Sequence, residues 1–278
     1  MITAMPRVAI ALNDFDAGVE TFRDQLGLPV VDISAGSVES LGAKLAMCVP
    51  EGGSNIELMS PANPDAPLSQ SLSRFLERRG EGLFALMLEA PDPDEEAIGL
   101  AERGLNVLPL MPGASGRDVH PNSTHGVLIR VYPTNSFSGG TSPSESGLSG
   151  IMRVLIAVRD LGRARTAYQT GFGLPCDPEQ HDESRGVQSF LCHPPAGGTI
   201  EFLTPADPAR PFAADVASLL EHREGLYALT LHGPAVRAST ALTRHGPAVR
   251  ASELPTRPLG RATTAFGARI FVESPSDA

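Results

Sequence analysis

The sequence is poor in cysteine and has no block of basic residues, and each shortage excludes a class of protein. Its 278 residues include three cysteines, Cys48, Cys176 and Cys192, an odd set without CxxC spacing. We therefore expect packed thiols in a reducing cytosol rather than metal ligands or a disulfide framework. The formal net charge is −10, without consecutive runs of lysine or arginine, which argues against nucleic acid or an anionic membrane as the main partner.

Long apolar runs are also missing. A stretch of about 18 apolar residues, the length that spans a bilayer, occurs nowhere, and the N-terminal "MITAMPRVAIALND" lacks a basic leader and a small-residue cleavage site. We expect a soluble, cytoplasmic protein. The glycine pairs at 52–53 and 197–198 lack the spacing of a phosphate-binding loop and predict hairpin turns.

What the chain does contain is an internal repeat. "RVAIALNDFDAGVETFRDQLGLPV" from Arg7 is echoed by "RVLIAVRDLGRARTAYQTGFGLPC" from Arg153. "GGSNIELMSPANPDAP" is echoed by "GGTIEFLTPADPARP", and "RRGEGLFALMLEAP" by "HREGLYALTLHGP". Three segments that recur in the same order indicate a tandem duplication of a unit about half the chain long.

The boundary between the halves is predicted from composition. "PTNSFSGGTSPSESGLSG" is rich in Ser, Gly, Pro and Thr, which is typical of a flexible linker. We therefore predict a first domain over 1–134, a linker over 135–149 and a second domain over 150–278.

Within the first half, apolar periodicity predicts strands and helices in alternation. We expect a helix over 14–27, capped by Asp14 or Asp16 and ended by Gly27, and further helices over 69–82 and 92–105. Strands are predicted at 7–12, 44–50, 55–61, 83–91 and 125–133. This pattern gives two βαβββ modules per half and four in the chain, a fold of the α+β class.

Three segments carry a resemblance to a known family: "RVAIALNDFDAGVETFRDQLGLPVV", "IELMSPANPDAPLSQSLSRFLERRGEGL" and "HPNSTHGVLIRV". The chain resembles the vicinal oxygen chelate superfamily of glyoxalase, bleomycin-resistance and extradiol-dioxygenase proteins, and its first half resembles the methylmalonyl-CoA epimerase branch. The resemblance implies that each pair of modules forms a cupped sheet. It also implies a divalent metal held in the cup by His, Gln or Glu, His and Glu from four inward-facing strand positions.

This sequence departs from that ligand pattern in both halves. The four positions hold Arg7, Glu57, Ala85 and Arg130 in the first half, and Arg153, Glu201, Ala228 and Phe271 in the second. Guanidinium, alanine and phenylalanine side chains offer no lone pair to a cation. We therefore predict that neither domain holds a metal and that the protein needs no cofactor. Arg130 also stands where the epimerase branch has a carboxylate base, and an arginine cannot act as a base near neutral pH; the second base falls near Leu45.

The substituted positions suggest a site for an anion. If Glu57 lies between Arg7 and Arg130, the first cup carries one uncompensated positive charge, which a small carboxylate, acyl thioester or phosphate would neutralise. Arg153, Glu201 and Arg269 are predicted to form a similar trio. Phe84 and Tyr227 are expected to wall the cups, and His120 and His125 to lie at the mouth of the first. The predicted ligand-binding residues are Arg7, Glu57, Arg130, Phe84, His125, Arg153 and Glu201.

Several functions stay open at this point. The chain is interpreted as a metal-free binding protein for a small anion, possibly an acyl-CoA, or as a metal-independent isomerase or lyase in which Arg7 or Arg130 stabilises an enolate. The alternative is a metal-dependent epimerase or dioxygenase. The arginines and glutamates are equally compatible with purely structural ion pairs. No nucleic acid or membrane partner is expected, and the chain is predicted to be a monomer or a homodimer.

Overall fold

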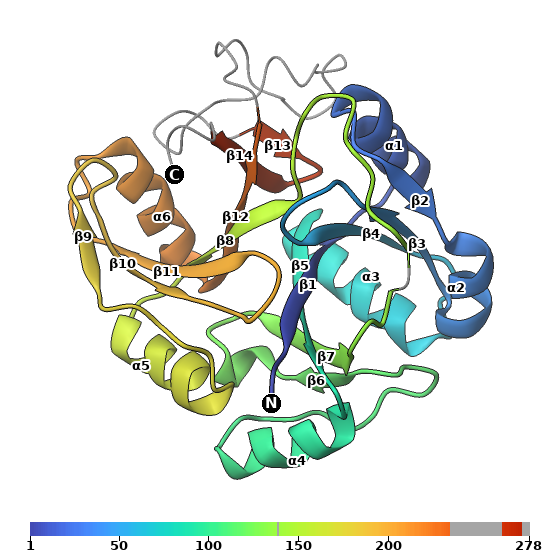
Figure 1. The fold of residues 1–278 in the computed structure, drawn as a ribbon, viewed down its shortest axis with the longest axis horizontal. Helices are drawn as coiled ribbons and strands as arrows, with labels where there is room; N and C mark the ends of the chain where they lie inside the picture. Colours follow the sequence, from blue (N-terminus) through green and yellow to red (C-terminus); the bar gives the residue numbers. More distant parts are fainter. Residues whose placement is uncertain (138, 234–262, 274–278) are drawn as a thin grey trace.

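A computed structural model describes residues 1–137, 139–233 and 263–273 of the chain (Figure 1). These residues form two seven-stranded sheets, with strand orders β2-β3-β4-β1-β5-β7-β6 and β9-β10-β11-β8-β12-β14-β13. The first sheet contains β1 (Ala4–Ala11), β2 (Val30–Asp32), β3 (Ala43–Cys48), β4 (Asn55–Pro61), β5 (Gly82–Ala90), β6 (Arg117–Val119) and β7 (Leu128–Pro133). The second contains β8 (Ile151–Ala157), β9 (Gln180–Asp182), β10 (Val187–Cys192), β11 (Thr199–Pro205), β12 (Gly225–His232), β13 (Thr263–Ala265) and β14 (Ala268–Glu273).

The helices begin and end where local chemistry predicts. The first half contains α1 (Phe15–Glu20), which continues as the π-helical turn η1 (Thr21–Gln25), then α2 (Ser34–Leu41), α3 (Pro67–Arg79), α4 (Pro93–Glu102) and the short η2 (Pro121–Ser123). The second half contains α5 (Leu161–Arg165), η3 (Thr166–Gly171) and α6 (Pro211–His222). Asp14, not Asp16, caps α1 by accepting a hydrogen bond from the backbone N–H of Ala17 at 3.0 Å. Gly27, with a φ of 63°, ends that helix as predicted.

The two sheets repeat the same strand register. Glu57 lies opposite Ala9 in the first sheet, and Glu201 lies opposite Leu155 in the second. The predicted α+β class is confirmed. All strands of the βαβββ pattern are present in the first and third modules. In the second module, the strand expected directly after α4 is only an isolated β-bridge between Val107 and Val119. The segment between β12 and β13 lies outside the described residues.

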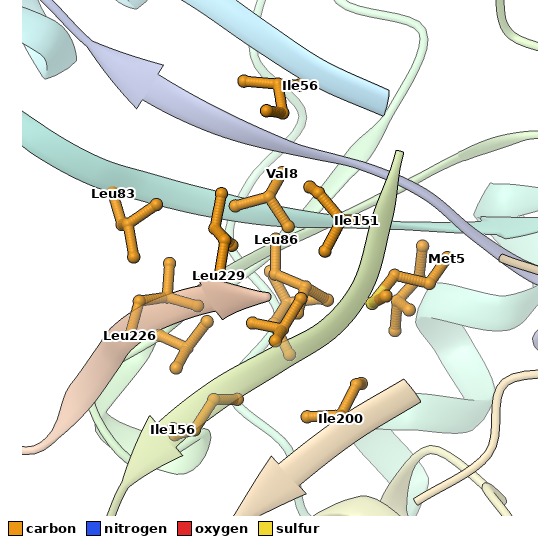
Figure 2. Close-up of a cluster of buried hydrophobic side chains, with 14 of the residues drawn as sticks. Met5, Val8, Ile56, Leu83, Leu86, Ile151, Ile156, Ile200, Leu226 and Leu229 are labelled. Atoms are coloured by element: carbon orange, nitrogen blue, oxygen red, sulfur yellow. The ribbon is translucent and has the colours of Figure 1, made fainter. Parts of the chain in front are cut away.

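Each sheet has two differently used faces, because successive strand residues point to opposite sides. Val8 and Ile10 of β1 join one core that contains residues of both sheets. Figure 2 shows Val8 in this core, beside Leu86 of the first sheet and Ile151 of the second. Ala9 and Ala11 point the other way and pack with α3. In the second sheet α6 covers the corresponding face. We call these two outer faces the first cup, under α3, and the second cup, under α6.

The Ser/Gly-rich segment between the sheets is hydrogen-bonded to the first sheet and its loops. The Ser142 N–H donates to the carbonyl of Val49 at 3.0 Å, and the Glu145 N–H donates to that of Gly27 at 2.9 Å. The segment can pair in this way because small residues let a backbone lie close to a neighbouring chain. Its flexibility stays a prediction. The domain boundaries stay a prediction.

The prediction of three packed thiols is wrong for two of them. Cys176 and Cys192 form a disulfide with their Cα atoms 4.1 Å apart, and Cys48 is a buried free thiol. An antiparallel bridge places the two cysteines opposite each other, a pairing that their separation of 16 residues does not reveal. Disulfides favour oxidising compartments, so the cysteines no longer support a cytosolic location, which stays a prediction. No helix in the described ranges is long and apolar enough to cross a membrane.

Candidate functional site

The four positions at which related proteins are expected to carry metal ligands share one face of each sheet. In the first cup, Arg7 and Arg130 both lie beside Met87, while Glu57 and Ala85 both lie beside Ala9. The predicted inward direction of these side chains is therefore seen in the structure. All of them are buried, so their partners decide what the first cup can do.

Arg7 is held by Glu57. Its Nε donates to Glu57 Oε2 at 2.9 Å, its Nη1 donates to Ser136 Oγ at 2.9 Å, and its guanidinium carbon lies 4.4 Å from the Tyr132 ring centre. Burial alone would lower the pKa of Arg7, but the charge of Glu57 outweighs it and the pKa is raised. Arg7 and Glu57 therefore form a buried ion pair in which each charge neutralises the other.

Arg130 does not contact Glu57 as predicted. It donates two parallel hydrogen bonds to Asp118, Nε to Oδ1 at 2.5 Å and Nη2 to Oδ2 at 2.7 Å, across the β6–β7 pair. Burial acts to lower the pKa of Arg130, but the hydrogen bonds to Asp118 and the nearby Tyr132 outweigh it, so the pKa is raised above its ordinary value. Each arginine thus has its own carboxylate. The prediction of an uncompensated positive charge in the first cup is therefore wrong. Sequence reasoning missed Asp118 because β6 has three residues and no extended apolar alternation.

The second cup holds its glutamate with two arginines, one of which was not predicted. Glu201 accepts from Arg185 at 2.5 and 3.2 Å and from Arg153 Nη1 at 3.3 Å. Burial would raise the pKa of Glu201, but the charges of Arg185 and Arg153 leave it lowered. Arg185 also bonds Asp182 at 2.6 Å. Burial opposes the lowering at Asp182 too, and bonds from Ser184 and Arg185 outweigh it, so its pKa falls to about 2.

Arg269 does not complete the predicted trio with Arg153 and Glu201. Its Nη2 lies 3.2 Å from Asp215 Oδ1, and its guanidinium carbon lies 4.8 Å from the centre of the Tyr227 ring. The Tyr227 hydroxyl donates to Asp215 Oδ2 at 2.8 Å. This carboxylate comes from α6, the helix over the cup, and its distance from Arg269 in sequence concealed the contact.

The equivalent arginines of the two cups differ in exposure. The Arg7 side chain is 6% exposed, whereas that of Arg153 is 31% exposed. Arg153 Nε is nevertheless buried and has no hydrogen-bond partner within the described part of the chain. A buried donor without a partner is destabilising, so the guanidinium of Arg153 is less fully satisfied than that of Arg7.

The two remaining predicted site residues lie in different places. Phe84 packs edge-on against Phe75 of α3, with ring centres 5.2 Å apart, and forms a wall of the first cup. His125 does not contact the charged residues of that cup. Its Nδ1 lies 3.1 Å from Glu224 Oε2 of the second domain, so it joins the two domains. His120 accepts from the Asn122 N–H at 3.1 Å and caps η2.

The donor sets do not fit a divalent metal. A metal needs lone pairs from its ligand positions. Two of these positions hold Arg7 and Arg130 in the first cup, and Arg153 and Phe271 in the second, which supply none. The two glutamates at ligand positions, Glu57 and Glu201, already pair with guanidinium groups. No group of three His, Cys, Asp or Glu residues that could hold a metal occurs in the ranges that the structure describes.

Comparison with known proteins agrees with this architecture. Residues 8–130 match a family model described as a glyoxalase-like domain, and residues 152–257 match the model of the glyoxalase/bleomycin resistance protein/dioxygenase superfamily. The chain belongs to the vicinal oxygen chelate superfamily and carries two glyoxalase-like domains. A search of curated proteins gave no match.

One of the solved structures shows the same fold over most of this chain. A triple mutant of 4-hydroxymandelate synthase from Streptomyces coelicolor is 13% identical, with a TM-score of 0.61 over 83% of this chain and 71% of that one. A methylmalonyl-CoA epimerase in complex with methylmalonyl-CoA is 25% identical, with a TM-score of 0.41 over 48% of this chain and 96% of that one. The epimerase from Mycobacterium tuberculosis is 27% identical, with a TM-score of 0.39 over 48% and 89%.

Proposed function

We propose that the protein binds a small carboxylate or acyl thioester without a metal, and that the second cup is the binding site. The observation that carries this proposal is Arg153. Its side chain is partly exposed, and its buried Nε lacks a partner among the described residues. A guanidinium donates two parallel hydrogen bonds to a carboxylate or an enolate-like oxygen pair, and the guanidinium of Arg153 is only partly satisfied by Glu201.

The first cup serves structure in this proposal. Its two arginines are buried and each is neutralised by one carboxylate, so an anion entering it would have to displace an existing partner. The repeated strand order and register support a tandem duplication, and the proposal adds that both halves have lost the metal ligands. In this history the ligand site was kept on one side and replaced by ion pairs on the other.

The equivalence of Arg7 and Arg153 gives a matched experiment. Binding of short mono- and dicarboxylates, and of N-acetylcysteamine thioesters, which carry no phosphate, is measured by calorimetry on the wild type, Arg153→Met and Arg7→Met. Losing one charge-assisted hydrogen bond costs about 1.5–3 kcal/mol. We therefore expect at least about tenfold weaker binding in Arg153→Met, and mainly a lower melting temperature in Arg7→Met.

The experiment also decides between binding and catalysis. Incubation of a bound thioester in deuterated water shows α-proton exchange by NMR if Arg153 stabilises an enolate and another group moves the proton. Binding without exchange supports the binding protein. Unchanged affinity of every probe in Arg153→Met contradicts the proposed site.

A further inference from the structure

A cavity of about 720 Å³ lies between the two domains, away from both cups. The first domain contributes residues just after α4 and in η2, and the second contributes residues of α5 and η3. Arg103, just after α4, donates from Nε to the carbonyl of Gly171 in η3 at 2.6 Å. The Tyr168 hydroxyl of η3 donates to the Thr124 carbonyl at 3.1 Å. The walls of this interdomain cleft are therefore fixed to each other.

The cleft is basic, although the chain as a whole carries a net charge of −10. Five arginines line it, against the two carboxylates Asp160 and Glu224. The arginines are Arg79, Arg103, Arg159, Arg163 and Arg223. A concentration of one charge sign in a cleft raises the local positive potential and attracts anions, even in a protein of opposite net charge.

Both carboxylates of the cleft already have other partners. Asp160 caps α5 by accepting from the Arg163 N–H at 2.9 Å. Glu224 accepts from the Arg159 N–H at 2.7 Å and contacts His125 Nδ1 at 3.1 Å. Neither forms an ion pair with an arginine side chain of the cleft in the described part of the chain. Of the five arginines, Arg103 pairs with Glu96 at 2.7 Å, and the other four stand against only these two carboxylates. Part of the positive charge of the cleft is therefore uncompensated.

The arginines divide into two groups. Arg103 and Arg159 are fixed by backbone carbonyls of Gly171 and Leu220. For Arg79, Arg163 and Arg223, the described residues offer no carboxylate within ion-pair distance. Burial and the neighbouring charges of Arg79 and Arg269 lower the pKa of Arg223 to about 10. Such mutual repulsion is relieved when an anion binds between the guanidinium groups.

We propose that the interdomain cleft binds an organic phosphate with at least two negative charges, held by Arg79 from the first domain and by Arg163 and Arg223 from the second. Phosphate oxygens match the forked geometry of guanidinium donors. Leu105 and Pro121 lie in the same cleft and provide apolar surface for the organic part. Because Arg79 belongs to the first domain and Arg163 and Arg223 belong to the second, the ligand also ties the domains together. The site is separate from the second cup and does not depend on the function proposed for it.

The test uses inorganic pyrophosphate and ADP as probes, with calorimetry on the full chain at physiological salt. The variants are Arg163→Glu and Arg223→Met, and the control is Arg74→Glu, which makes the same charge reversal on an exposed residue of α3 outside the cleft. We expect saturable binding of both probes, about tenfold or more weaker in each cleft variant and unchanged in the control. Circular dichroism confirms that each variant is folded.

Any of three results would overturn the proposal. They are no saturable binding of pyrophosphate or ADP, equal weakening of binding in Arg74→Glu, and unchanged affinity in both cleft variants. Pyrophosphate bound without ADP would contradict a site for an organic phosphate. Arg153→Met, the variant that tests the second cup, is expected to bind pyrophosphate normally. A failure of one site is thereby distinguished from a failure of the other.

Discussion

At the scale of single residues, the ion pair between Arg130 and Asp118 is the strongest departure from the expected site. Both side chains are buried, and two parallel hydrogen bonds join them. Removing one partner of such a pair leaves the other charged and unsatisfied, whereas replacing both with apolar groups is often close to neutral. The pair is therefore expected to matter for stability in an asymmetric way.

We predict that Asp118→Ala lowers the free energy of unfolding by about 3–5 kcal/mol, and that the double change Arg130→Met with Asp118→Leu recovers most of the loss. Urea denaturation measures both. The control is Asp94→Ala, because Asp94 is 74% exposed and pairs with Arg117, so its loss is expected to cost less than about 1 kcal/mol. Equal effects of Asp118→Ala and Asp94→Ala would contradict a buried structural pair.

The second residue-scale prediction concerns pH. The folded pKa values of Asp182 and Glu201 are lowered, so their contribution to stability is present above the unfolded values of about 3.9 and 4.3 and is lost as the pH falls through the folded values. For Asp182 the folded pKa is about 2. We expect the melting temperature to fall between about pH 4 and 2. Glu201→Gln should be less stable than the wild type at pH 7 and show a shallower acid dependence, and Glu179→Gln, at an exposed position, should resemble the wild type.

At the scale of secondary structure, the sequence patterns locate the long elements better than the short ones. The strands β3, β4 and β5 and the helices α3 and α4 lie where apolar periodicity predicts them. The elements α2, β2 and β6 were not predicted. Helix α2 reads "SAGSVESL", with small polar residues instead of an amphipathic pattern, and β2 and β6 have three residues each. The two short strands form because β3 and β7 supply their hydrogen-bond partners.

The candidate site divides in the same way. The inward direction of Arg7, Glu57 and Arg153 follows from strand alternation and is visible in sequence. Asp118, the partner of Arg130, comes from a short strand, and Arg185, which pairs with Glu201, comes from a hairpin. Pairing across the sheet, which sequence spacing does not encode, therefore decides the charge balance of both cups.

The disulfide between Cys176 and Cys192 gives a prediction for one element. It joins the loop after η3 to the end of β10. In denaturant without reductant, thiol titration should find one reactive cysteine, Cys48, and three after reduction. Closing a loop of this size contributes about 3 kcal/mol in the chain-entropy account, so Cys176→Ser should lower the free energy of unfolding by about that amount. Three reactive thiols before reduction would contradict the bond.

At the scale of the whole molecule, the two domains form one body through matching turns. The turn at Gly126 lies against Glu224 of the second domain, and the turn at Gly267 lies against Glu81 of the first. A Cβ added at Gly126 would lie 2.3 Å from the Glu224 carbonyl oxygen. This clash can be relieved only if the backbone of one of the two domains moves.

We predict that Gly126→Ala destabilises the protein more than Gly173→Ala does. Both glycines have a positive φ, but a Cβ at Gly173 would meet nothing within 4 Å. The control therefore carries the backbone strain of about 1 kcal/mol alone, and the difference between the two variants reports the contact between domains. Thermal unfolding measures it, and equal melting temperatures would contradict a tight interface at Gly126.

The central claim is that this two-domain member of its superfamily works without a metal in either cup. The most direct measurement is elemental analysis of protein purified without chelator and after equilibration with manganese, cobalt and zinc. The account predicts far less than one divalent metal per chain, with no change in Glu57→Ala or Glu201→Ala. One stoichiometric metal that is lost in either variant would contradict it.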